Sequence, residues 1–134
     1  MLPDARTALK KYRLKAAHER LDSSRLLLEH GNYKDSIGRS YYAMFTSVRA
    51  LLAKDGVDFS KHAGVISYFQ REYIKTGKID SRFSKYISQA FQIRNNVDYA
   101  DFFIVSQEDA REQFLRAQEL CCALEVYLNS EISQ

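Results

Sequence analysis

Proline, glycine and cysteine are all scarce in this chain, and each scarcity excludes a class of structure. The single proline is Pro3, and only five glycines interrupt the rest. Long stretches are therefore free of helix-breaking residues, which favours a helical fold over one built on many tight turns. The two cysteines, Cys121 and Cys122, are adjacent, and adjacent cysteines rarely form a disulfide with each other. This excludes a fold held together by disulfides and fits a protein of a reducing compartment.

Long hydrophobic runs are also missing. No segment approaches the roughly 20 apolar residues of a membrane span, and the first fifteen residues hold no apolar stretch of signal-peptide length. We therefore expect a cytoplasmic protein with no membrane partner. The three histidines, His18, His30 and His62, do not stand at ligand spacing from cysteines or carboxylates. The sequence thus predicts no metal site and no cofactor.

Charge and length set further bounds. The formal net charge of +3 is mild for 134 residues, so it neither demands nor excludes an RNA partner. A chain of this length can bury a core without disulfides or metal, and we expect one domain over residues 1–134.

Apolar residues recur at spacings of three and four along most of the chain, and no segment alternates as a strand would. This pattern predicts an all-α, up-and-down bundle of four to five helices. The expected helices cover residues 4–30, 34–54, 61–75, a segment from Asp80 or Ser81 to about 97, and a last one from Ser106.

Turn and cap residues support these boundaries. Gly31 is expected to end the first helix. Ser60 is expected to cap the third helix, and Asp80 or Ser81 the fourth. Ser106 and Asp109 have the spacing of a capping-box variant at the start of the last helix. In the second helix, a set of small residues would let a neighbouring helix approach closely: Ser36, Gly38, Ser40 and Ala43.

Arg94 lies in the apolar stripe of the fourth expected helix. The stripe runs through Phe83, Ile87, Ala90, Arg94 and Val97 at steps of 4, 3, 4 and 3. An uncompensated buried guanidinium costs several kcal/mol, so Arg94 needs a partner or must line a groove. Asp98, one turn further, is the obvious partner. The pair is either a structural ion pair, within the helix or closing a helix or dimer seam, or part of a functional groove.

Three segments in order, "SYYAMFTSVRALL" (40–52), "KHAGV" (61–65) and "IRNNVDY" (93–99), resemble a HEPN domain of the small stand-alone prokaryotic kind. The resemblance covers nearly the whole chain. It implies a helical bundle that forms a homodimer. It also implies a minimal nucleotidyltransferase partner in a two-gene toxin–antitoxin module.

Ribonuclease members of that family carry an arginine, a polar residue and then a histidine. The implied reaction is metal-independent, with the ribose 2′-hydroxyl attacking the adjacent phosphate. Arg94 and Asn95 match the first two positions, but Tyr99 stands where the histidine is expected. A tyrosine with a pKa near 10 is a poor base at neutral pH. Five helical residues also turn a side chain roughly 140° from Arg94, so the helix must end near Val97 or a second subunit must share the site.

Other residues could complete a binding groove. His62 begins the third expected helix and is either a replacement acid–base group or a residue that packs beside the turn. Tyr41 either packs in the core with a polar partner for its hydroxyl, or one of Tyr41 and Tyr42 hydrogen-bonds Arg94 or Asp98. Arg39 and Arg49 are expected at a solvated or phosphate-facing edge.

Tyr99 has a second possible role. In some toxin–antitoxin pairs of this family, the nucleotidyltransferase adds AMP to a tyrosine just after the histidine motif. That spacing falls on Asp101 here, and Tyr99 is the nearest candidate acceptor.

Three functions therefore compete. The first is a HEPN toxin with weak, metal-independent endoribonuclease activity. The second is a non-catalytic, dimeric nucleotide-binding or regulatory subunit of a nucleotidyltransferase. The third, a helical adaptor, leaves the position of Arg94 unexplained.

Overall fold

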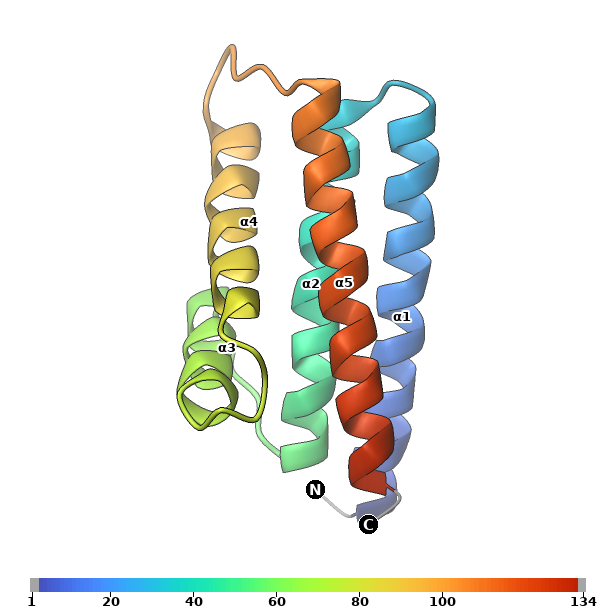
Figure 1. Cartoon of the computed structure of the whole chain (residues 1–134), viewed down its shortest axis with the longest axis vertical. Helices are drawn as coiled ribbons and strands as arrows, with labels where there is room; N and C mark the ends of the chain where they lie inside the picture. The colour runs from blue at the N-terminus through green and yellow to red at the C-terminus, as the bar shows by residue number, and fades with distance from the viewer. Residues whose placement is uncertain (1–2, 133–134) are drawn as a thin grey trace.

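Helices account for nearly all of the structure, a computed structural model that describes residues 3–132. They are α1 (Pro3–Glu29), α2 (Tyr33–Asp55), α3 (His62–Phe69), the π-helical turn η1 (Gln70–Ile74), α4 (Arg82–Tyr99) and α5 (Gln107–Ile132). Between residues 3 and 132 there is no strand, so the predicted all-α bundle is confirmed. The long helices lie side by side, with α3 at the lower end of α4 (Figure 1).

Glycines occupy the turns that end the first two helices. Gly31 ends α1 with a φ of 81°, as predicted, and Gly56 ends α2 with a φ of 73°. At α2 the backbone N–H groups of Gly56 and Val57 donate to the carbonyl groups of Ala53 and Leu52. Left-handed backbone at these positions favours glycine because it has no Cβ.

Two of the predicted caps form and one does not. Ser106 and Asp109 make the reciprocal bonds of a capping box, with the Asp109 N–H 3.0 Å from the Ser106 Oγ. At α4 the carboxylate of Asp80 accepts the Arg82 N–H at 2.9 Å. The prediction for Ser60 was wrong because the extended residue before α3 is Lys61, one position later, and it makes no side-chain cap bond.

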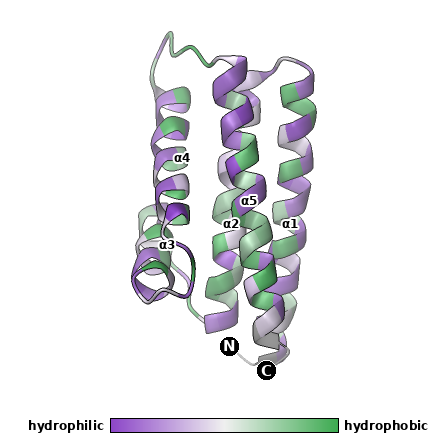
Figure 2. Cartoon of the chain, viewed as in Figure 1, coloured by the Kyte–Doolittle hydropathy of each residue, from purple (hydrophilic) through white to green (hydrophobic). Residues whose placement is uncertain are grey.

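The core surrounds α2, which packs against α1, α5, α4 and α3. Figure 2 shows hydrophobic residues concentrated on α2 and on the lower half of α5. Ser24 of α1 hydrogen-bonds to Ser36 and Ser40 of α2 in a fully buried cluster, so these small residues do allow close approach. Gly38 does not share this role, since a Cβ there would meet nothing within 4 Å.

None of the helices within residues 3–132 is both long enough and apolar enough to cross a bilayer.

Candidate functional site

Arg94 lies half-buried between α4 and α2, with 19% of its side chain exposed. Its Nη2 donates a hydrogen bond of 2.7 Å to the hydroxyl of Tyr42. Its Nε lies 2.8 Å from the Oδ2 of Asp98, but the N–H does not point along this contact, which is therefore an ion pair rather than a hydrogen bond. The guanidinium also lies 5.3 Å from the ring centre of Tyr42 and 5.8 Å from that of Tyr41, within cation–π range. Arg94 thus has both a partner in its own helix and one across the helix interface.

His62, the first residue of α3, lies beside this arginine site. Its ring stacks on Phe45 with 4.0 Å between ring centres, and its Nδ1 lies 2.8 Å from the hydroxyl of Tyr41. Burial lowers the pKa of His62 below 6.5, and the nearby charges of Arg94 and Arg49 lower it further. The imidazole is therefore neutral at pH 7.

The hydrogen bond between Tyr41 and His62 determines which ring nitrogen carries the proton. Burial raises the pKa of Tyr41 well above 10, so its hydroxyl stays protonated. Tyr41 is fully buried, and His62 Nδ1 is the only acceptor that the described residues offer to this hydroxyl. Tyr41 therefore donates to Nδ1, and the neutral ring carries its proton on Nε2. His62 can donate a hydrogen bond to an anion through Nε2, but that nitrogen has no lone pair to act as a base.

The two tyrosines of "SYYAMF" therefore take different roles. Tyr41 packs in the core and finds a polar partner, while Tyr42 hydrogen-bonds Arg94 across the interface. Both contacts anticipated from the sequence form, one on each tyrosine.

Tyr99 does not face Arg94 within the chain. The expectation that α4 ends near Val97 was wrong, because the helix continues through Tyr99 and the carbonyl of Asn96 accepts the Ala100 N–H at 3.0 Å. A continuous helix turns Tyr99 roughly 140° from Arg94, and its side chain is 79% exposed. Only a second subunit could bring this hydroxyl to a ligand of Arg94. Asn95, the next residue of α4, is half-buried, and its side chain makes no hydrogen bond with the described residues.

Some neighbours of the site were missed by sequence reasoning. Phe45 and Phe91 surround the His62 ring, and Arg13 reaches from α1 to the carbonyl of Arg49 at 2.8 Å. The signal for Arg13 was its position four residues before buried Ala17, on the inner edge of α1. Within residues 3–132 no group of three histidine, cysteine or acidic side chains is arranged to hold a metal ion.

Comparison with known proteins places this geometry in a family. The HEPN domain matches residues 11–127, which include every residue of the site. A Thermotoga maritima protein, "UPF0332 protein", is 35% identical over 114 residues, covering 85% of this chain and 86% of that protein. "UPF0332 protein PH1297" of Pyrococcus horikoshii is 42% identical over 77 residues, or 58% of this chain and 54% of that protein. "Putative toxin MJ0142" of Methanocaldococcus jannaschii is 33% identical over 97 residues, or 72% of this chain and 66% of that protein. The chain therefore belongs to the HEPN domain family.

Proposed function

We propose that this HEPN protein is the toxin of a cytoplasmic toxin–antitoxin pair and acts as a slow, metal-independent endoribonuclease. The observation that carries the proposal is Arg94, held half-buried by Tyr42 and Asp98 beside the neutral imidazole of His62. Two Methanocaldococcus jannaschii relatives are named as toxins, "Putative toxin MJ0142" and "Putative toxin MJ0605", and these names support it.

The chemistry assigns each group a role. The 2′-hydroxyl of a ribose attacks the adjacent phosphorus and loses its proton to water. The bond from phosphorus to the 5′-oxygen of the next nucleotide breaks, that oxygen takes a proton from water, and a 2′,3′-cyclic phosphate remains. Arg94 stabilises the charge of the pentacoordinate intermediate, and His62 donates a hydrogen bond to the phosphate through Nε2. Within residues 3–132, the position at which ribonuclease members have histidine brings no base to Arg94, because Tyr99 points away. Lack of an acid–base group typically costs about 10²–10⁴-fold in rate, so cleavage is slow.

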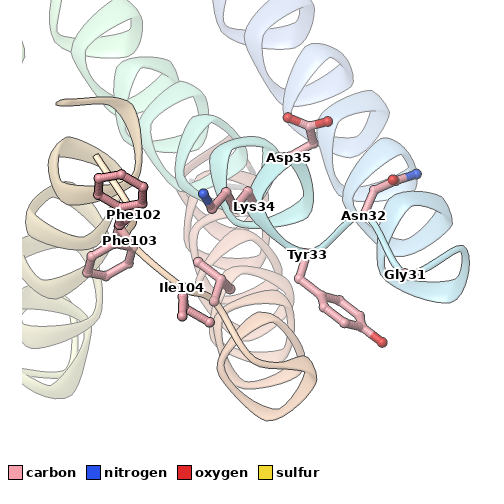
Figure 3. Close-up of a pocket in the computed structure, with 9 residues that line it drawn as sticks. Gly31, Asn32, Tyr33, Lys34, Asp35, Phe102, Phe103 and Ile104 are labelled. Atoms are coloured by element: carbon pink, nitrogen blue, oxygen red, sulfur yellow. The ribbon is translucent and has the colours of Figure 1, made fainter. Parts of the chain in front are cut away.

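The protein is proposed to act as a homodimer. The end of α4 and the segment that follows it expose large hydrophobic side chains, with Tyr99 at 79%, Phe102 at 96% and Ile104 at 85% exposure. Phe102 also has a φ of 62°, a strained value for a bulky residue. Figure 3 shows Phe102 and Phe103 beside a hollow of about 370 Å³ at the start of α2. A two-fold interface through this segment would cover the apolar side chains and bring each Tyr99 toward the partner's site.

The second partner is a minimal nucleotidyltransferase. An antitoxin of this type would add AMP to an accessible tyrosine, and the exposed hydroxyl of Tyr99 is available for that transfer. The alternative function, a non-catalytic nucleotide-binding subunit of the same nucleotidyltransferase, is favoured by the tyrosine at the position where ribonuclease members have histidine.

Expression of the chain in a bacterial host, alone and with Arg94→Ala, tests the proposal. We expect growth arrest with the natural chain, and slow RNA cleavage in EDTA by the purified protein. Arg94→Ala should abolish both, whereas Arg111→Ala, at an exposed arginine with no ion pair among the described residues, should change neither. Tyr99→His should raise the rate if the dimer places residue 99 at the partner's Arg94.

The other outcomes discriminate between the rivals. Rapid cleavage that survives Arg94→Ala would move the chemistry to another group, with His62 the next to be substituted. No cleavage by the natural chain or by Tyr99→His, together with tight binding to a nucleotidyltransferase, would overturn the toxin in favour of the subunit.

A further inference from the structure

The helix α2 is covered by its neighbours except along one strip. The residues of α2 that retain exposure between its ends follow each other at helical spacing and form what we call the α2 strip: Lys34, Asp35, Gly38, Arg39, Tyr42, Thr46 and Arg49. Because α2 packs on α5 (Figure 1), and α1 and α4 flank it, the strip lies between α1 and α4.

The upper half of the strip is the floor of a groove of about 500 Å³. One wall is Leu27 of α1, and the other is Val97 and Asp98 of α4. Tyr42 lies in the same groove and is the hydrogen-bond acceptor of Arg94. The groove therefore leads directly into the arginine site described above.

Gly38 leaves the floor of this groove open. A glycine inside a helix is destabilising relative to alanine. The backbone of Gly38 has an ordinary negative φ, and a Cβ there would meet nothing within 4 Å. No contact with the described residues therefore requires glycine at this position. The open backbone suits a ligand that approaches the helix closely.

The lower end of the strip carries an excess of positive charge. Asp58 lies between two guanidinium groups, 3.0 Å from Arg49 and 3.3 Å from Arg13. The Nε of Arg49 is buried and has no hydrogen-bond partner. One carboxylate thus faces two arginines, which leaves this end able to take a further anion.

The strip as a whole is cationic. Lys34 and Arg39 are exposed and form no ion pair with any described residue. The strip and the side chains that lean onto it hold five cations (Lys34, Arg39, Arg49, Arg13 and Arg94) against three carboxylates (Asp35, Asp58 and Asp98). This small area therefore accounts for two of the three net positive charges of the chain.

We propose that the α2 strip is a track for the ribose–phosphate backbone of single-stranded RNA. The strand passes Lys34 and Arg39, crosses the open backbone of Gly38, presents its reacting phosphate at Arg94 and places a flanking phosphate at Arg49. Lys34 and Arg49 are fifteen residues apart, or roughly 22 Å along the helix, which is too long for a mononucleotide. The inference rests on the proposed ribonuclease function and names how its substrate is held.

A second copy of the chain is a poorer occupant of the strip. A two-fold interface brings the same patch of both subunits together, so the excess positive charges would face each other. The apolar segment around Phe102 borders the strip only at Lys34 and Asp35, which line the same hollow. A dimer formed through that segment would leave the strip from Gly38 to Arg49 free.

Binding of a fluorescein-labelled 2′-O-methyl RNA 12-mer, measured by anisotropy at several salt concentrations, tests the track without cleavage. For single strands, log K against log[salt] has a slope of about −0.7 per phosphate contact. Arg39→Gln and Arg49→Gln should each weaken binding and make the slope shallower by about 0.7. The matched control Arg111→Gln, also a helical arginine, should leave both unchanged.

Gly38→Leu tests the groove independently of charge. The leucine side chain fills open space and leucine is a better helix former than glycine, so the variant should melt no lower than the natural chain. Its binding should nevertheless weaken, because the side chain blocks the floor.

The outcomes separate the track from the proposed function. If cleavage depends on Arg94 but the variants at Arg39, Arg49 and Gly38 bind RNA as tightly as the natural chain, the track alone is wrong. Absence of both RNA binding and cleavage would overturn both. If the strip variants instead halve the mass of a dimer in light scattering, a second copy occupies the strip and the track is wrong.

Discussion

The hydrogen bond from Tyr41 to His62 can be removed by a single atom change, Tyr41→Phe. The phenylalanine keeps the ring packing of Tyr41 on Tyr42, Phe45 and Phe91. It deletes only the hydroxyl that donates to His62 Nδ1 at 2.8 Å. The substitution therefore isolates one bond of the candidate site from the surrounding core.

The expected cost follows from burial. A hydrogen bond of this kind contributes about 0.5–1.5 kcal/mol net, and a buried acceptor left without a partner costs about 1–3 kcal/mol. His62 is only half-buried, so we place the destabilisation in the lower part of this range, at about 1–2 kcal/mol. For 134 residues, with about 2.1 cal/mol/K of unfolding entropy per residue, this corresponds to a Tm lower by roughly 4–7 °C.

Thermal unfolding measures this cost, and ring ¹⁵N NMR reads the protonated nitrogen of His62. We expect the proton on Nε2 in the natural protein and a mixture of tautomers in Tyr41→Phe. Tyr12→Phe is the control, since Tyr12 is 70% exposed and its hydroxyl has no partner among the described residues. Equal Tm values for the two variants, or a natural protein with the His62 proton on Nδ1, would refute the assigned bond.

Three further predictions test the fold and the site. Ser24→Ala should lower the free energy of unfolding in urea by about 1–3 kcal/mol, because it leaves the buried hydroxyl of Ser40 unpaired. Adding Ser40→Ala should recover part of that loss. A double variant whose loss equals the sum of the two single losses would contradict this pairing. Burial, Arg94 and Arg49 lower the pKa of His62, so between that lowered pKa and 6.5 the unfolded state binds more protons. Stability should therefore fall as the pH drops from 7 through this window, and His62→Asn should flatten the pH dependence of unfolding. Ser106→Ala should lower the free energy of unfolding by about 1 kcal/mol, because it removes the capping box. Ser60→Ala removes no cap and should change the same free energy by no more than about 0.5 kcal/mol.

Much of the fold could be predicted because its determinants are local. The periodicity of apolar residues identified all the long helices, and Gly31 and the Ser106–Asp109 box marked their ends. The errors amount to one or two residues at helix ends. The cap predicted at Ser60 falls one residue before the N-terminal cap position of α3. The helix α4 runs two residues past Val97, because no proline or glycine stops it there.

The sequence by itself determined the helices and the contact of Arg94 with Asp98, since residues four apart on a helix are neighbours whatever surrounds them. Only the tertiary structure decided that Tyr42 is the second partner of Arg94, that Tyr41 donates to His62, and that Tyr99 points away from both. Contacts between helices depend on how far each helix is rotated and shifted against its neighbours. That arrangement is fixed by the packing of the whole core around α2, which no local spacing records.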